Sequence, residues 1–225
     1  MLLAGPPAPY RDSRRFDGWP VELFVHTAAS LAHYRAKDLA RRQPTMLRLV
    51  GESVLLVDVD GSGAALQADC RGQLAAGPPA LTASEVQSQR YRISDLLDDL
   101  AGVVDPVERT AIATALWGAA LRLLLAGSGR WLGTGKGLVQ EVVALDAAAG
   151  TQEAAWFDHA LRAALAGEVA PLVQAADRVL DRHGGRLFEG YRVGASRGRN
   201  PALGRRRRSA LRRPHGCRGR VIPVC

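Results

Sequence analysis

The chain has 225 residues, of which 47% are hydrophobic and 23% are charged. These proportions are close to the averages for soluble globular proteins, so we expect one ordinary domain or two small ones, and a wholly disordered chain is excluded. The sequence has no uninterrupted apolar run of about 18 residues, and its start lacks the basic segment of a signal peptide. We therefore expect no membrane-spanning helix and a cytoplasmic protein.

The net charge of +8 is unevenly distributed along the chain. Residues 196–225 contain ten arginines and no acidic residue, so the rest of the chain carries a net charge of −2. This basic segment has neither helical nor strand periodicity, which is typical of a disordered tail. Its charge favours salt-dependent binding of nucleic acid or another polyanion, without base stacking because it has no aromatic residue. The alternative is a tail with no binding role.

The first 80 residues carry the patterns of a small α+β region. Prolines and glycines over residues 1–20 indicate loops. Alternating apolar and β-forming residues predict strands at Val21–His26 and Val54–Asp58. Helices are expected between and after these strands, at residues 27–42, 44–50 and 64–75.

Beyond residue 79 the periodicity is helical. Thr82 and Glu85 form a capping box, and Asp105 followed by Pro106 marks a second helix start. The helix after Asp105 is apolar on most sides, as is typical of the centre of a bundle. The expected helices, about five as in a small bundle, occupy residues 82–102, 106–126, 135–146, 152–166 and 168–182.

Several short strings resemble one known family. Residues 17–27 and 49–58 resemble the later half of a small nucleotidyltransferase domain, as in bacterial proteins related to aminoglycoside adenylyltransferases of the DNA polymerase beta-like superfamily. Residues 129–136 look like the lysine-bearing loop and helix start of the family's helical domain, and residues 185–191 also fit. The resemblance implies an α+β protein: a partial, mixed nucleotidyltransferase sheet with helices at 1–80, an all-α helical bundle at 81–195, and an unrelated Arg-rich tail at 196–225.

The family reaction transfers a nucleoside monophosphate from a nucleoside triphosphate, such as ATP, to a hydroxyl acceptor with Mg²⁺. Its signature is a Gly-Ser turn, whose amides cradle the triphosphate, followed by an Asp-x-Asp pair that holds the metal. No such signature stands upstream of Glu22. We therefore expect an N-terminally truncated domain and a chain impaired or inactive in this reaction. Asp58 and Asp60 have the Asp-x-Asp spacing of the signature, but Gly61-Ser62 follows them directly. We therefore expect them to form a turn.

The resemblance implies two site residues. Glu22, on the strand after the missing signature, would be the catalytic carboxylate and a ligand of Mg²⁺; the alternative is a solvent-facing glutamate. Lys136, at a helix start after Gly133-Thr134-Gly135, would contact the nucleotide phosphates; the alternative is an ordinary exposed lysine. The segment is not a P-loop, because Gly137 follows the lysine where Ser or Thr is required.

Other residues with reactive or aromatic side chains have a structural interpretation first. His26 ends a strand without a partner at catalytic spacing, so a hydrogen bond to the backbone is expected. For Trp117, Trp156 and Phe157 we expect core positions rather than nucleobase platforms, and for Cys70 a position as a small core residue. We expect Asp95, Asp98 and Asp99 to form a solvated acidic face rather than a site for a cationic acceptor. Two alternatives to the enzyme remain: a non-catalytic helical binding or partner module, and nucleic-acid binding through the tail.

Overall fold

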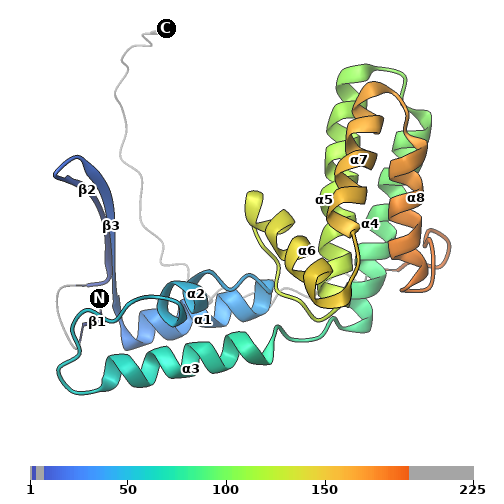
Figure 1. Cartoon of the computed structure of the whole chain (residues 1–225). Helices are drawn as coiled ribbons and strands as arrows, with labels where there is room; N and C mark the ends of the chain where they lie inside the picture. The colour runs from blue at the N-terminus through green and yellow to red at the C-terminus, as the bar shows by residue number, and fades with distance from the viewer. Residues whose placement is uncertain (1, 4–7, 193–225) are drawn as a thin grey trace, which may run out of the picture. The chain divides into compact units, whose positions relative to one another are not determined.

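The computed structural model describes residues 2–3 and 8–192, in which a small sheet is followed by eight helices (Figure 1). The strands are β1 Leu2–Leu3, β2 Tyr10–Phe16 and β3 Trp19–Thr27. The helices are α1 Ala28–Arg41, α2 Thr45–Gly51, α3 Ser62–Ala76, α4 Ala83–Gly102, α5 Pro106–Gly127, α6 Lys136–Ala149, α7 Glu153–Ala166 and α8 Ala170–Asp181. The α+β class is confirmed. The separation of domains at residue 80 stays a prediction, and the expected tail at 196–225 lies outside the described residues.

The strands β2 and β3 form an antiparallel hairpin closed by a two-residue turn. Asp17 and Gly18 have φ angles of 47° and 83°, the two positive values that a type I′ turn requires. The register places Phe16 opposite Trp19 on either side of this turn. The expectation of loops over residues 1–20 is therefore wrong, because the Asp-Gly pair allows the chain to reverse and gives the segment before it a strand to pair with.

Pro20 lies inside β3, where a missing N–H normally disrupts a sheet. The Phe16–Trp19 pair that closes the turn is a hydrogen-bonded pair, so the next pair, Arg15 with Pro20, is a non-hydrogen-bonded one. The nitrogen of Pro20 consequently points away from β2. This explains how the proline is accommodated on the outer edge of β3.

The expected helix starts are confirmed by side-chain caps. Thr27 and Ser30 form a capping box at α1, and Thr82 and Glu85 form another at α4. Asp105 accepts hydrogen bonds from two backbone N–H groups in the first turn of α5. The caps confirm that these three starts were set by residues within one turn of the helix.

The expected strand at Val54–Asp58 is wrong. Residues 54–58 form no regular element, and the side chains of Val54, Leu56 and Val57 are exposed. A β-rich segment becomes a strand only beside another strand edge, and none of the described strands pairs with this segment. Its last residue, Asp58, instead caps α3 by accepting from the N–H groups of residues 63 and 64.

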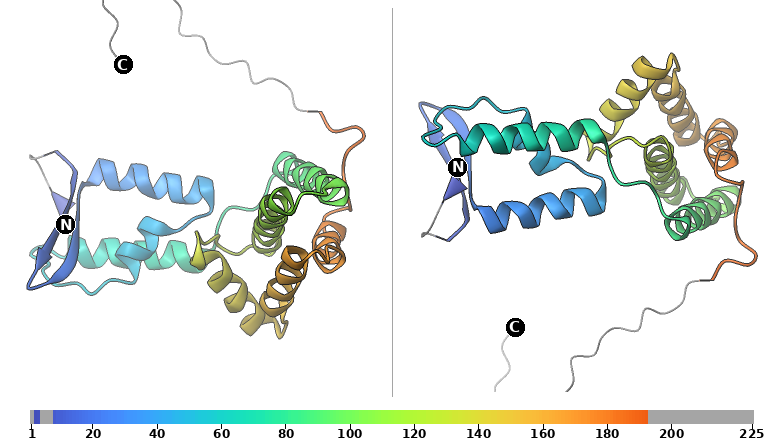
Figure 2. Two further views of the ribbon diagram at one scale, coloured as in Figure 1. Left: turned by 90° about the horizontal axis from the view of Figure 1, so that it is seen from above. Right: turned by 90° about the horizontal axis from the view of Figure 1, so that it is seen from below.

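The main hydrophobic core lies in the bundle around α5, which contacts α4, α6, α7 and α8 (Figure 2). A smaller cluster of Leu47, Cys70 and Trp131 lies against α2 and α3. By length and composition α5 is apolar enough to cross a membrane, but half of its most apolar window is buried inside the protein. A core helix of a soluble protein has the same properties, so the fold is compatible with a soluble protein. The cytoplasmic location stays a prediction.

Candidate functional site

Glu22 lies near the middle of β3, opposite Ser13 of β2. Its side chain is 48% exposed and forms an ion pair with Arg11. The Arg11 guanidinium also lies over the ring of Phe24, 5.1 Å from the ring centroid. Glu22 is therefore a half-exposed carboxylate whose charge is already balanced by one neighbouring cation.

The two faces of the hairpin have different chemistry. Since side chains alternate along a strand and paired residues share a face, the pairing register assigns each side chain. Glu22 shares its face with Arg11, Ser13, Arg15, Pro20 and Phe24. The opposite face carries the exposed apolar side chains of Tyr10, Phe16, Trp19 and Leu23. The candidate site is thus on the polar face.

The edge of β3 away from β2 is open beside Glu22. Hydrogen-bonded and non-hydrogen-bonded pairs alternate along the hairpin from the Phe16–Trp19 pair, which makes Glu22 and Ser13 a non-hydrogen-bonded pair. The backbone N–H and C=O of Glu22 therefore point to the outer edge of β3. On that edge β1 pairs in parallel with His26 and Thr27 only. Within residues 2–3 and 8–192, no strand occupies the position next to Glu22.

Lys136 is the first residue of α6 and follows a tight turn. Gly135, the residue before the helix, has a φ of 53°. A Cβ on Gly133 would lie 2.0 Å from the backbone carbon of Gly137, so only glycine fits at that position. Lys136 is therefore an exposed lysine at the start of α6, and no anion partner of it is seen among the described residues. Its role in phosphate binding stays a prediction.

The structure does not join the two expected site residues. No hydrogen bond or ion pair links Glu22 on β3 with Lys136 on α6. The described residues also contain no group of three or more His, Cys, Asp or Glu side chains arranged to hold a metal ion. Glu22 alone, paired with Arg11, does not fit a Mg²⁺ site, because such a site combines several oxygen ligands. The expected metal belongs with the Asp-x-Asp pair and stays a prediction.

Asp58 and Asp60 do form a turn, as expected from the sequence. Asp60 accepts a hydrogen bond from the N–H of Ser62 at 3.0 Å, and hydrogen bonding by Ser62 lowers the pKa of Asp60. Asp58 caps α3 with both oxygens. Backbone N–H groups thus engage both oxygens of Asp58 and one oxygen of Asp60, and within the described residues the two are not part of a group of three or more possible metal ligands.

His26 has a side-chain partner rather than the expected backbone partner. Its Nδ1 lies 3.1 Å from the Ser30 hydroxyl, which also accepts from the N–H of Thr27. Burial lowers the pKa of His26, which favours the neutral ring. The hydroxyl belongs to the capping box of α1, so we assign the pair a structural role.

The aromatic and acidic candidates on the bundle helices take structural positions. Phe157 is fully buried, and Trp117 and Trp156 pack against the core. The Arg178 guanidinium covers one face of the Trp156 ring, so that face is not free for a nucleobase. Asp95, Asp98 and Asp99 are exposed on α4, which agrees with a solvated acidic face.

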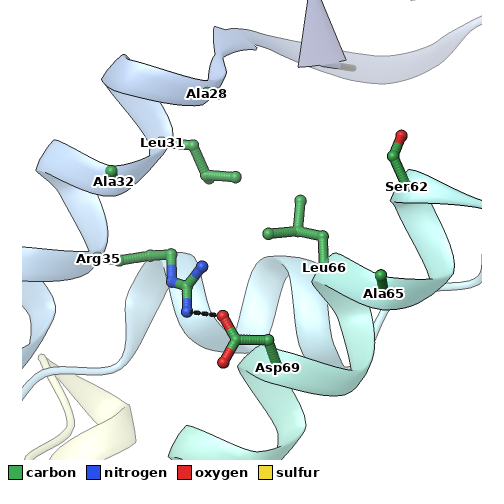
Figure 3. A pocket seen from close by; sticks show the side chains of 8 residues that line it. All are labelled: Ala28, Leu31, Ala32, Arg35, Ser62, Ala65, Leu66 and Asp69. Carbon is green, nitrogen blue, oxygen red and sulfur yellow. Dashed lines mark hydrogen bonds and ion pairs between the residues drawn. The ribbon is translucent and has the colours of Figure 1, made fainter.

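A cleft of about 390 Å³ lies between α1 and α3 (Figure 3). Its walls are mainly alanine and leucine side chains, and the ion pair of Arg35 with Asp69 spans it. Neither Glu22 nor Lys136 lines it. The two charges neutralise each other, so the cleft adds no free group to a phosphate or metal site.

Arg11 and Ser13 are the neighbours of Glu22 that sequence reasoning missed. Their signal was the Asp17-Gly18 pair, a strong indicator of a hairpin, from which alternation places residues 11, 13 and 15 beside Glu22. Comparison of the chain with known protein families, curated proteins and solved structures found no match.

Proposed function

We propose that this chain is a nucleotidyltransferase-like protein that acts on a nucleoside triphosphate and a hydroxyl acceptor through Glu22. The described residues hold Glu22 without further carboxylates beside it, so we expect no detectable nucleotide transfer by residues 1–225. One observation carries the proposal: the carboxylate of Glu22 is half exposed, and no strand among residues 2–3 and 8–192 pairs with the outer edge of β3 beside it.

The register indicates what that strand position would receive. β1 runs parallel to β3 with Leu2 opposite His26. A strand continuing in this register, four residues before Leu2, would lie beside Glu22 at the usual strand spacing of about 4.8 Å. Carboxylates on such a strand would face the same solvent region as Glu22. We propose this position for the Asp-x-Asp strand of the family arrangement, which neighbours the strand with the third carboxylate.

The role assigned to Glu22 is that of a general base. In the family reaction the acceptor oxygen forms a bond to the α-phosphorus, the bond from that phosphorus to the bridging oxygen breaks, and pyrophosphate leaves. Glu22 would accept the proton of the acceptor hydroxyl. Its ion pair with Arg11 must open for Oε1 to take part, because the guanidinium occupies that carboxylate oxygen.

The test is transfer of label from ATP labelled at the α-phosphate, with pyrophosphate release measured in parallel. The chain of residues 1–225 should show no transfer, because losing the charged groups that align donor and acceptor costs several kcal/mol and each ~1.4 kcal/mol is tenfold in rate. The chain extended at its N-terminus by a strand bearing Gly-Ser and Asp-x-Asp should be active. Glu22→Gln should then remove most of the activity, whereas Glu52→Gln, an exposed carboxylate on α2's C-cap, should not.

Lys136 has a matched control, since Lys37 is the second of the chain's two lysines. Lys37 lies over the Tyr34 ring on α1, 5.5 Å from the centroid. Lys136→Gln should weaken ATP binding about fivefold or more, the usual effect of losing a charge-assisted contact; Lys37→Gln should not.

Vigorous transfer by the unextended chain would overturn the proposal and make Asp58 and Asp60 the residues to test.

A further inference from the structure

A second cleft, of about 610 Å³, lies on the bundle where α7 begins and contacts α8. Its walls come from the loop before α7, from Trp156 and His159 on α7, and from Arg178 on α8. Clefts that hold small organic ligands have volumes of about 300–1,000 Å³, so this one is large enough. Neither Glu22 nor Lys136 lines it. The cleft is therefore a candidate site separate from the one proposed for nucleotide transfer.

Two arginines share one buried carboxylate at this cleft. The Glu153 side chain is only 9% exposed, and it accepts from Arg182 Nη2 at 2.6 Å and from Arg178 Nη2 at 3.3 Å. The shorter bond is the one to Arg182, so Glu153 mainly balances that charge. Asp146, at the same corner of the bundle, is engaged by the Thr151 hydroxyl and by two backbone N–H groups of α7. The charge of Arg178 is therefore only partly balanced.

The Arg178 guanidinium is held in place and still has donors to offer. It lies over the ring of Trp156, and its side chain is 47% exposed. A guanidinium presents five N–H donors, and within the described residues Arg178 makes one hydrogen bond, to Glu153. Burial, and then the charge of Arg182, lower the pKa of Arg178, so an anion beside it would stabilise its charged form. The wall of the cleft thus carries a positioned cation with free N–H groups.

We propose that this cleft binds a small organic monocarboxylate that carries an aromatic ring. The carboxylate would accept from the free N–H groups of Arg178, because the planar fork of a guanidinium matches two carboxylate oxygens. The ring would lie against Trp156 and Ala155, which supply the apolar part of the wall. A single negative charge is enough to balance Arg178, whereas a cationic ligand would be repelled. The site uses no residue of the proposed transfer reaction and does not depend on it.

The test follows the indole N–H signal of Trp156 by NMR in the full chain, because this signal reports on the cleft rather than on the arginines at 196–225. Trp156→Phe identifies it among the signals of the chain's four tryptophans. Titration with 2-naphthoate should shift the signal to saturation. The neutral isostere 2-naphthamide should bind about fivefold or more weakly, because its contact with Arg178 is not charge-assisted. Acetate, which lacks the ring, and 2-naphthylmethylamine, which is cationic, should also bind more weakly than 2-naphthoate.

Two variants test the role of Arg178. Arg178→Gln should weaken binding of 2-naphthoate about fivefold or more and leave binding of 2-naphthamide nearly unchanged. Arg162→Gln is the control, since Arg162 is in an exposed ion pair with Asp158 on α7 and does not line the cleft; both affinities should stay the same. Glu153 keeps Arg182 as a partner in Arg178→Gln, so the bundle should fold. If that variant does not fold, the comparison of the four probes in the wild type still decides.

Equal affinities for 2-naphthoate and 2-naphthamide would overturn the inference, because the cleft would then recognise no charge. Tighter binding of 2-naphthylmethylamine, or of acetate, would overturn the cationic or the apolar part of the site. Equal losses in Arg178→Gln and Arg162→Gln would show a response to net charge alone. A Trp156 signal that none of the probes shifts would mean that the cleft binds no ligand of this class.

Discussion

Arg42 binds Glu85 through both terminal guanidinium nitrogens, with Nη1 2.8 Å from Oε1 and Nη2 2.9 Å from Oε2. The same guanidinium donates to the carbonyls of Pro79 and Ala80. Glu85 is also the carboxylate of the capping box that starts α4. One side chain therefore fixes the connection between α3 and α4 and the first turn of the bundle.

This pair makes stability depend on pH in the acid range. The Arg42 guanidinium, helped by the N–H of Thr82, lowers the pKa of Glu85 from 4.5 to about 2. A carboxyl group whose pKa is depressed by folding stabilises the folded state above its unfolded pKa, and this contribution is lost as the pH falls from 4.5 toward 2. Because Glu85 is partly exposed and water screens the pair, we expect a contribution of about 1 kcal/mol at pH 7.

Urea unfolding of the wild type and of Glu85→Gln at pH 7, 4 and 2.5 measures this contribution. The two proteins should differ most at pH 7 and converge as the pH falls. Glu52→Gln is the control, since Glu52 is in an exposed ion pair with Arg48 at 3.6 Å and should change stability by only a few tenths of a kcal/mol. If the free energies of unfolding of the wild type and Glu85→Gln differed by the same amount at all three pH values, the pair would not link stability to pH.

Leu124 lies fully inside the bundle on α5, and Leu124→Ala should reduce the free energy of unfolding by about 2–5 kcal/mol. The loss combines buried apolar surface with a cavity that neighbouring helices cannot fill. Val107→Ala, on the same helix at a side chain 78% exposed, should change it by less than about 0.5 kcal/mol. Chemical denaturation measures both; equal effects would mean that α5 is not the central helix.

Gly133 is required by a close backbone approach, and Gly133→Ala should destabilise the protein by about 1–3 kcal/mol. The added Cβ would meet the backbone of Gly137, so the helix start that presents Lys136 must shift, and ATP binding through Lys136 should weaken. Gly72→Ala is the opposite case, since nothing lies within 4 Å in the interior of α3. That substitution should stabilise the protein by about 0.5–1 kcal/mol. Thermal melting would refute this account if both substitutions shifted Tm in the same direction.

Removal of residues 196–225 should leave Tm almost unchanged and abolish DNA binding at low salt. The segment carries ten arginines and few apolar side chains, so it has charge for phosphates and little surface to bury. Melting curves and a filter-binding titration at two salt concentrations measure the two effects. DNA binding that survives the truncation would place the basic site on another part of the chain.

Residues close together in the sequence were enough to predict the helices. The capping boxes of Thr27 and Thr82 and the Asp105-Pro106 start are complete within four residues, and each begins a helix in the structure. The apolar periodicity after residue 79 also predicted the bundle with α5 at its centre. Such features are determined by the sequence alone, because hydrogen bonds at a helix end and the face of a helix depend on neighbours along the chain.

The strands and the site depended on tertiary structure. Val54–Asp58 has strand-forming residues but pairs with none of the strands that the structure describes. Residues 10–16 form a strand because the turn at Asp17-Gly18 gives them β3 as a partner. The same pairing places Arg11 beside Glu22. Within the described residues it does not bring Glu22 into a group of three or more possible metal ligands. A strand is satisfied only by hydrogen bonds to another segment, so which segments pair, and which side chains then meet, is decided when the chain folds.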